Sequence, residues 1–107
     1  MARELLLDTS ALVSLLDRSQ SRHAECVAFF RAWSGAVVST EAVLTEASHL
    51  LGRVHGGREA CLRFFTEGGA TLVPSDASTL RRCLELVRPY ADLPLDVADA
   101  TLVVLAE

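Results

Sequence analysis

Three short apolar runs, set between stretches with helical periodicity, constrain the fold of this chain more than any other feature. They are ELLL at 4–7, AVVS at 36–39 and ATLV at 70–73. Each run is bounded by turn or capping residues, and strands that are buried on both faces have this pattern. Strands that alternate with helices predict a parallel sheet with helices on both of its faces. We therefore expect an α/β fold.

Between and after these runs, apolar residues recur at the spacing of a helix. The expected helices contain, in order, residues 12–16, residues 26–33, residues 43–54, a shorter segment that ends near Thr66, a segment from the N-cap Ser75 to about Val87, and a last segment that begins near Asp96. The prolines at 89 and 94 predict a loop before the last helix.

The length of 107 residues allows one domain, because independent cores usually need roughly 100 to 150 residues. The sequence stops inside an apolar helical pattern, and no strand pattern follows it. A domain of this class normally returns to its sheet. We therefore expect residues 1–107 to form a single domain that lacks its C-terminal part, including one or more strands.

Composition excludes several classes of protein. No apolar stretch approaches the roughly 20 residues of a membrane span, and the acid in MARELLLD is unlike a signal peptide, so we expect a cytoplasmic protein. Cys26, Cys61 and Cys83 are widely spaced among apolar residues, which predicts free core thiols. The net charge is −4 and all ten basic residues are arginine, so nucleic acid must be held by local arginines, metal ions or a partner.

Two acidic residues stand at conspicuous places in the first half of the chain. Asp8 directly follows the first strand, and ligands of open α/β sheets bind beyond the carboxyl ends of strands. A helix cap formed by Asp8, Thr9 or Ser10 is the simpler explanation of the same residues. Glu46 lies on the flank of the buried stripe of its helix, where a solvated side chain is the simpler explanation.

The stretch LPLDVADATLVVLAE, residues 93–107, carries the most information. From residue 97 to residue 106 it is apolar around the whole circumference except at Asp99 and Thr101, which predicts a helix surrounded by protein. Asp96 and Asp99 share one side of this helix, and a buried carboxylate needs a partner. The alternative is an N-cap at Asp96 with Asp99 in the first turn, both facing free backbone N–H groups.

If these four acids converge, their charges repel one another. A divalent cation such as Mg²⁺ or Mn²⁺ removes that repulsion, because a few carboxylates and several waters make its preferred octahedron. A bound ion of this kind lowers the pKa of a water molecule and braces a phosphodiester for in-line attack. The acids thus indicate metal-assisted hydrolysis if they meet in one pocket, which spacing alone leaves open.

Three motifs of the chain resemble the PIN-domain family and, within it, the VapC-type toxins of prokaryotic toxin–antitoxin pairs. They are LLLDTSALVSLL, VVSTEAVLTEASHLL and LPLDVADATLVVLAE, which stand in the family's order and spacing. The resemblance covers essentially the whole chain. It implies a three-layer α/β/α domain with a parallel sheet, and metal-dependent endonucleolytic cleavage of RNA by a metal-activated water.

The resemblance also implies roles for particular residues. The family's first aspartate matches Asp8, the glutamate of its middle helix matches Glu46, and the late aspartate of its DA pair matches Asp99. Asp96 matches an additional acid that some members have one turn earlier. In the family the residue at Thr9 or Ser10 often supports the first aspartate, and Ser10 is the one expected to do so here. Asp8, Glu46 and Asp99 are therefore the expected catalytic residues and, with Asp96, the expected ligands of Mg²⁺ or Mn²⁺.

Family members usually continue into a strand and a TxD segment with a further acid, and this sequence ends before that point, at Glu107. The resemblance implies three partners, namely an RNA substrate, an antitoxin protein whose chain occupies a groove beside the acids, and a second copy of the chain in a homodimer. Arg18, Arg22 and Arg53 lie near the ends of helices that border the expected site, so they are candidate contacts for the RNA backbone.

Three other functions match parts of the sequence. A phosphatase of the haloacid dehalogenase type needs a second aspartate at position 10, where this chain has Ser10. The pair Glu46 and His49 is half of a di-iron motif, but the sequence has no second copy. The main alternative is a catalytically inactive PIN-like module that binds protein or RNA, because the acidic net charge and the absent TxD segment both fit it.

Overall fold

The computed structural model describes residues 3–90 and 96–107. Within them, β1 (Glu4–Leu6), β2 (Ala36–Thr40) and β3 (Thr71–Val73) form one parallel sheet in the order β1-β2-β3. Leu6 pairs with Val38, and Thr40 pairs with Val73. The three predicted strands are confirmed to within a residue at their ends, and their carboxyl ends meet at one edge of the sheet.

Helices flank and connect the strands. In the described residues they are α1 (Thr9–Leu16), α2 (His23–Ala32), α3 (Glu41–Leu51), α4 (Gly57–Thr66), α5 (Ala77–Val87), a 3-10 turn (Arg88–Tyr90) and α6 (Val97–Ala106). Four of these helices begin where a side-chain oxygen accepts a bond from a free backbone N–H, and the caps are Asp8, Thr40, Asp76 and Asp96. The prediction of Ser75 as the cap of α5 is wrong by one residue, because Asp76 makes that bond.

The main core lies between α1, α3 and α4. Leu12, Val43 and Leu51 are fully buried there, and Cys61 of α4 and Ala98 of α6 join the same cluster. Burial raises the pKa of the Cys61 thiol, which behaves as a small apolar residue. The prediction of free core thiols holds for Cys61 and Cys83, whereas Cys26 is only half-buried.

None of the helices in the described part of the chain has the length and apolar character needed to span a bilayer.

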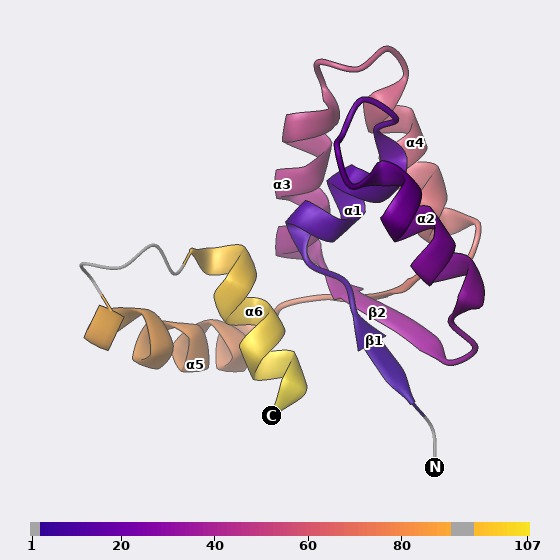
Figure 1. Ribbon diagram of the computed structural model, residues 1–107. Coiled ribbons are helices and arrows are strands. Elements are labelled where there is room, and N and C mark those ends of the chain that lie inside the picture. The colour runs from indigo at the N-terminus through magenta and orange to yellow at the C-terminus, as the bar shows by residue number, and fades with distance from the viewer. Residues whose placement is uncertain (1–2, 91–95) are drawn as a thin grey trace.

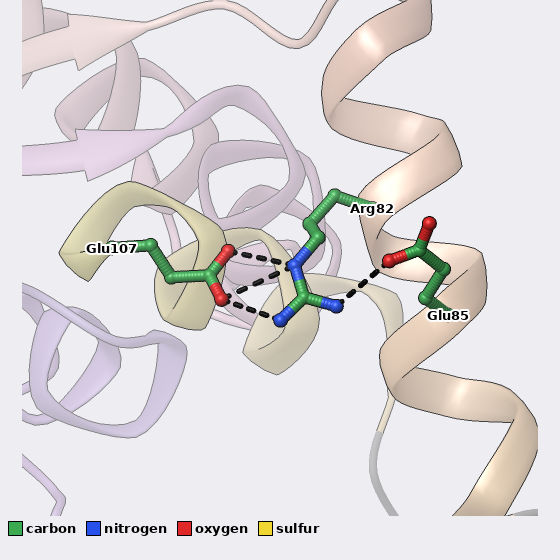
Figure 2. A network of polar contacts seen from close by, with 3 residues as sticks. All are labelled: Arg82, Glu85 and Glu107. Carbon is green, nitrogen blue, oxygen red and sulfur yellow. Dashed lines mark hydrogen bonds and ion pairs between the residues drawn. The ribbon is translucent and has the colours of Figure 1, made fainter.

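Helices α5 and α6 pack against each other, to one side of the group formed by α1 to α4 (Figure 1). Arg82 of α5 binds Glu107, just after α6, through Nε at 3.0 Å and through Nη2 at 2.6 Å, and it also binds Glu85 on its own helix (Figure 2). Helix α6 also touches β2 and α3. The arrangement is consistent with a three-layer α/β/α domain, as predicted.

The prediction that α6 is surrounded by protein is wrong. Its small residues Ala98, Ala100 and Thr101 are buried, but Val97 is 58% exposed and Val103 is 42% exposed. Helix α6 packs against α5, α3 and β2, and a stripe that contains Asp99, Val103 and Ala106 stays exposed. The acids of this helix are therefore exposed at its N-terminal end rather than buried.

Candidate functional site

Asp8, Glu46 and Asp99 line one open cavity of about 320 Å³. Asp8 reaches it from the end of β1, Glu46 from the middle of α3, and Asp99 from the first turn of α6. The other lining residues are Thr9, Ser10, Val13, Gln20, Leu50 and Arg53. We call this space the acid cavity. Three carboxylates that lie far apart in the sequence thus share one pocket beyond the carboxyl end of a strand.

The position of Asp8 follows from the way β1 ends. The Leu7 N–H donates to the carbonyl of Val38 at 2.9 Å, and the Ser39 hydroxyl donates to the carbonyl of Leu7 at 2.6 Å. These two bonds continue the ladder one residue past β1 and leave Asp8 as the first residue beyond it. Asp8 Oδ1 then accepts from the Ala11 N–H at 2.7 Å. The side chain therefore caps α1 and lines the cavity at the same time.

The start of α6 is built in the same way. Asp96 Oδ1 accepts from the Asp99 N–H at 2.8 Å, which is the capping arrangement that the sequence left as an alternative. Asp96 is not among the residues that line the acid cavity, whereas Asp99 is. Asp96 therefore acts on the site indirectly. It caps the helix that carries Asp99, and its charge raises the pKa of Glu46 and of Asp99.

The carboxylates of the cavity lie within electrostatic reach of one another. Burial raises the pKa of Glu46, and the charges of Asp96 and Asp99 raise it further. Partial desolvation by the surrounding protein also raises the pKa of the exposed Asp99, with further contributions from Asp96 and Asp8. Each shift has the direction expected when acids crowd together without a compensating cation. The pocket is thus a place where added positive charge is favourable.

The donor atoms suit a hard divalent cation, since they are carboxylate oxygens beside the hydroxyl groups of Thr9 and Ser10. Thr9 Oγ1 is buried and has no hydrogen-bond partner among the described residues. No three His, Cys, Asp or Glu side chains of the described chain are grouped closely enough to hold an ion together. At most two of these side chains could thus bind an ion directly, and water would have to complete its coordination shell.

Of the three arginines predicted to contact RNA, only Arg53 lines the acid cavity. Arg22 pairs with Glu25 at 3.1 Å and lines a neighbouring groove. Arg18 is exposed and lines neither space. The ion pair of Arg53 joins its Nη2 to Asp17 Oδ2 at 3.8 Å.

Sequence reasoning missed one residue of this region, Asp17, and it chose Ser10 over Thr9 as the support of Asp8. Both residues line the cavity, and Thr9 is half-buried whereas Ser10 is exposed. Asp17 follows the apolar pattern of α1 and precedes Ser19, and an Asp two residues before a Ser is a signal for a side chain that binds the backbone of a turn. That signal predicts the turn, but not the burial of the carboxylate.

The chain is similar to known proteins in sequence and in fold. The family model described as PIN domain matches residues 5–107. The chain is 30% identical over 105 residues to Ribonuclease VapC26 of Mycobacterium tuberculosis (strain ATCC 25618 / H37Rv), covering 96% of this chain and 78% of that protein. Its fold matches the crystal structure of Mycobacterium tuberculosis VapC20, described as a sarcin–ricin loop cleaving toxin, with a TM-score of 0.83.

The match to VapC20 has 19% sequence identity and covers 92% of this chain and 77% of that chain, so it bears on the fold alone. Family membership rests on the sequence, because the family model spans nearly the whole chain and the relative VapC26 is aligned over most of its length. The protein therefore belongs to the PIN-domain family, in its VapC-type group.

Proposed function

We propose that this protein is the toxin of a toxin–antitoxin pair and acts as an endoribonuclease that depends on Mg²⁺ or Mn²⁺. The observation that carries the proposal is the meeting of Asp8, Glu46 and Asp99 in one cavity. The relative VapC26 is named a ribonuclease, and the structural neighbour VapC20 is described as a toxin that cleaves the sarcin–ricin loop. Family and site thus favour the same activity.

In this proposal Asp8, Glu46 and Asp99 are the catalytic residues and hold the ion directly or through water, with Asp96 assisting. When bound by these residues, such an ion would lower the pKa of a water molecule and would add positive charge to the site. The chain's own part is to keep the carboxylates in place. The capping bond to Ala11 orients Asp8, and the buried contact between Thr40 and Thr101 ties α6 to the start of α3.

The antitoxin partner has a candidate place beside the acids. A groove of about 340 Å³ runs between β1, α1 and α2, and it touches Asp8 and Ser10 at one end. Its remaining walls are mainly apolar and include Leu5, Leu15 and Phe29. A partner chain with apolar side chains would bury them here and close the approach to Asp8. We further propose that the protein forms a homodimer, because large apolar side chains are exposed on α5 and α6. We also propose a cytoplasmic location.

The alternative is a PIN-like module that binds RNA or protein without cutting. Asp8→Asn separates the two possibilities, because asparagine keeps a capping oxygen but removes the charge. We expect this variant to retain the thermal stability of the wild type and to lose roughly 100-fold or more of its RNA-cleaving rate in Mg²⁺. Asp99→Asn should behave in the same way.

The matched control is Asp76→Asn, which changes another capping aspartate, at α5, that does not line the acid cavity. It should cut RNA at the wild-type rate, and chelation of the metal should stop cutting in both proteins. A wild-type chain that binds RNA but never cuts it in Mg²⁺ or Mn²⁺ would favour the binding module. Equal rates in wild type and Asp8→Asn would remove Asp8 from the proposed site.

A further inference from the structure

The carboxylate of Asp17, at the C-terminal end of α1, is buried although no catalytic role is proposed for it. Its side chain is 4% exposed. Oδ1 accepts from the Ser19 N–H at 2.9 Å and from the Ser19 hydroxyl at 2.7 Å, and Oδ2 accepts from Gln20 Nε2 at 3.2 Å. These bonds, and then the Arg53 charge, lower the pKa of Asp17, so the group carries its charge at neutral pH.

Two of the groups around Asp17 are also walls of the acid cavity. Gln20 comes from the turn between α1 and α2, and Arg53 comes from the turn after α3. Both meet Asp17 at the same oxygen, Oδ2. One buried carboxylate thus joins two separate loops at the rim of the pocket.

Arg53 pairs with Asp17 and not with a carboxylate of the acid cavity. Its side chain is 63% exposed, and among the described residues that line the acid cavity it carries the only positive charge. Asp8, Glu46 and Asp99 line the same space, so an unrestrained guanidinium would be drawn onto them. In the structure its ion pair goes to Asp17 instead. That choice leaves the cavity carboxylates without an arginine partner among the described residues.

We propose that Asp17 is a positioning residue, which holds Arg53 at the rim of the acid cavity and away from its carboxylates, so that the guanidinium can bind a phosphate of the RNA. The inference rests on the proposed ribonuclease function. Asp17 touches one edge of the guanidinium, and the exposed remainder presents N–H donors that suit a phosphate. The arginine thus offsets part of the repulsion between RNA and an acidic site.

The test measures RNA binding in a chain that does not cut. Asp8→Asn is the background, and a labelled single-stranded RNA is titrated in Mg²⁺ at several NaCl concentrations. The association constant K falls as salt rises, so the slope of log K against log salt is negative. Adding Arg53→Gln should reduce the magnitude of this slope by roughly 0.7, the value for one contact to a single-stranded phosphate. Asp17→Asn keeps an oxygen for Ser19 but loses the charge, and it should lower the slope equally. Both changes together should have the effect of one.

The matched control is Arg63→Gln. Arg63 is 62% exposed and pairs with Glu59 and Glu67 on α4, and it does not line the acid cavity. Its loss should leave the slope unchanged. In the cutting protein, Asp17→Asn should raise KM more than it lowers kcat, which a purely structural residue would not do. A slope unchanged by Asp17→Asn, or a double variant with the sum of two effects, overturns the proposal.

If Asp17→Asn does not fold, the pair is tested from the arginine side. NMR titration should show that Arg53→Gln raises the pKa of the Asp17 carboxyl and that Arg63→Gln does not, and equal values in both would overturn the proposal. The proposed function fails separately, since a wild-type chain that never cuts RNA in Mg²⁺ or Mn²⁺ rejects it while the salt slopes still report on Arg53. If the protein cuts RNA but Asp17→Asn leaves the salt slope of RNA binding unchanged, only the positioning role of Asp17 is rejected.

Discussion

Single acidic residues in this protein serve two purposes, and the capping and functional explanations of Asp8 do not exclude each other. One oxygen of Asp8 is bound to the Ala11 N–H, while the side chain still lines the acid cavity. Capping holds the carboxylate in one rotamer at the strand end, which is what a ligand for an ion needs. Asp96 caps α6 in the same manner and thereby fixes the first turn that carries Asp99.

Thr101→Val tests the buried link between α6 and α3. The Thr101 hydroxyl donates to the Ala98 carbonyl at 2.7 Å, so the Thr40 hydroxyl is the donor in the 2.8 Å bond to Thr101. Valine has nearly the same shape but leaves the buried Thr40 donor without its acceptor. We expect the free energy of unfolding in urea to fall by about 1 to 3 kcal/mol.

The control is Thr66→Val, at an exposed position on α4 whose hydroxyl binds the Arg63 carbonyl. It should change the free energy of unfolding by less than about 0.5 kcal/mol. If the free energy of unfolding falls equally in both variants, the bond between Thr40 and Thr101 does not stabilise the fold more than an exposed hydroxyl contact does.

The charge of Asp17 predicts a pH dependence of stability. Its pKa in the folded chain lies below the ordinary value of 3.8, chiefly because of the Ser19 bonds. The carboxylate therefore stabilises the fold fully above that ordinary value, and the contribution is lost as the pH falls through the folded pKa. Asp17→Asn should be less stable than the wild type near pH 7, and the difference should shrink near pH 2. A constant difference in urea unfolding across this range would contradict the prediction.

Whole elements were easier to predict than their surroundings. The strands follow from apolar runs and the helices from spacing and caps, and both signals are local. The exposure of α6 was not predictable in this way. A run such as TLVVLA is apolar on every face, so periodicity cannot say which positions become buried. Only the packing of α6 against α5, α3 and β2 decides that Ala98, Ala100 and Thr101 are buried and Val103 is exposed.

Arg82→Met tests how α5 and α6 hold together. Arg82 forms a two-pronged pair with Glu107 and a third contact with Glu85, while methionine keeps the apolar stem and removes the charge (Figure 2). The pair is partly exposed, so we expect a loss of at most about 1 kcal/mol in the free energy of unfolding, and a smaller loss in high salt. Arg81→Met, at an exposed neighbour, is the control and should be close to neutral. Equal effects at the two positions would contradict the prediction.

For the molecule as a whole, stability and the site depend on the same core. Leu51 ends α3, is fully buried and belongs to the cluster between α1, α3 and α4. Leu51→Ala should lower the free energy of unfolding by about 2 to 5 kcal/mol, because it removes buried methyl groups and leaves a cavity. Leu62→Ala, at a half-exposed position on α4, should cost less than about 0.5 kcal/mol. Chemical denaturation measures the free energy of unfolding of both variants, and similar decreases in the two would contradict the prediction.

The sequence by itself determined the order of strands and helices along the chain, the α/β class and the family, because periodicity, caps and motif spacing are local or linear properties. It also named Asp8, Glu46 and Asp99, but it left their meeting open. Only the tertiary structure decided that these side chains line one cavity, that Arg53 pairs with Asp17 rather than with the acids, and that α6 stays exposed along one stripe. Each of these depends on how elements far apart in the chain pack, which no local pattern encodes.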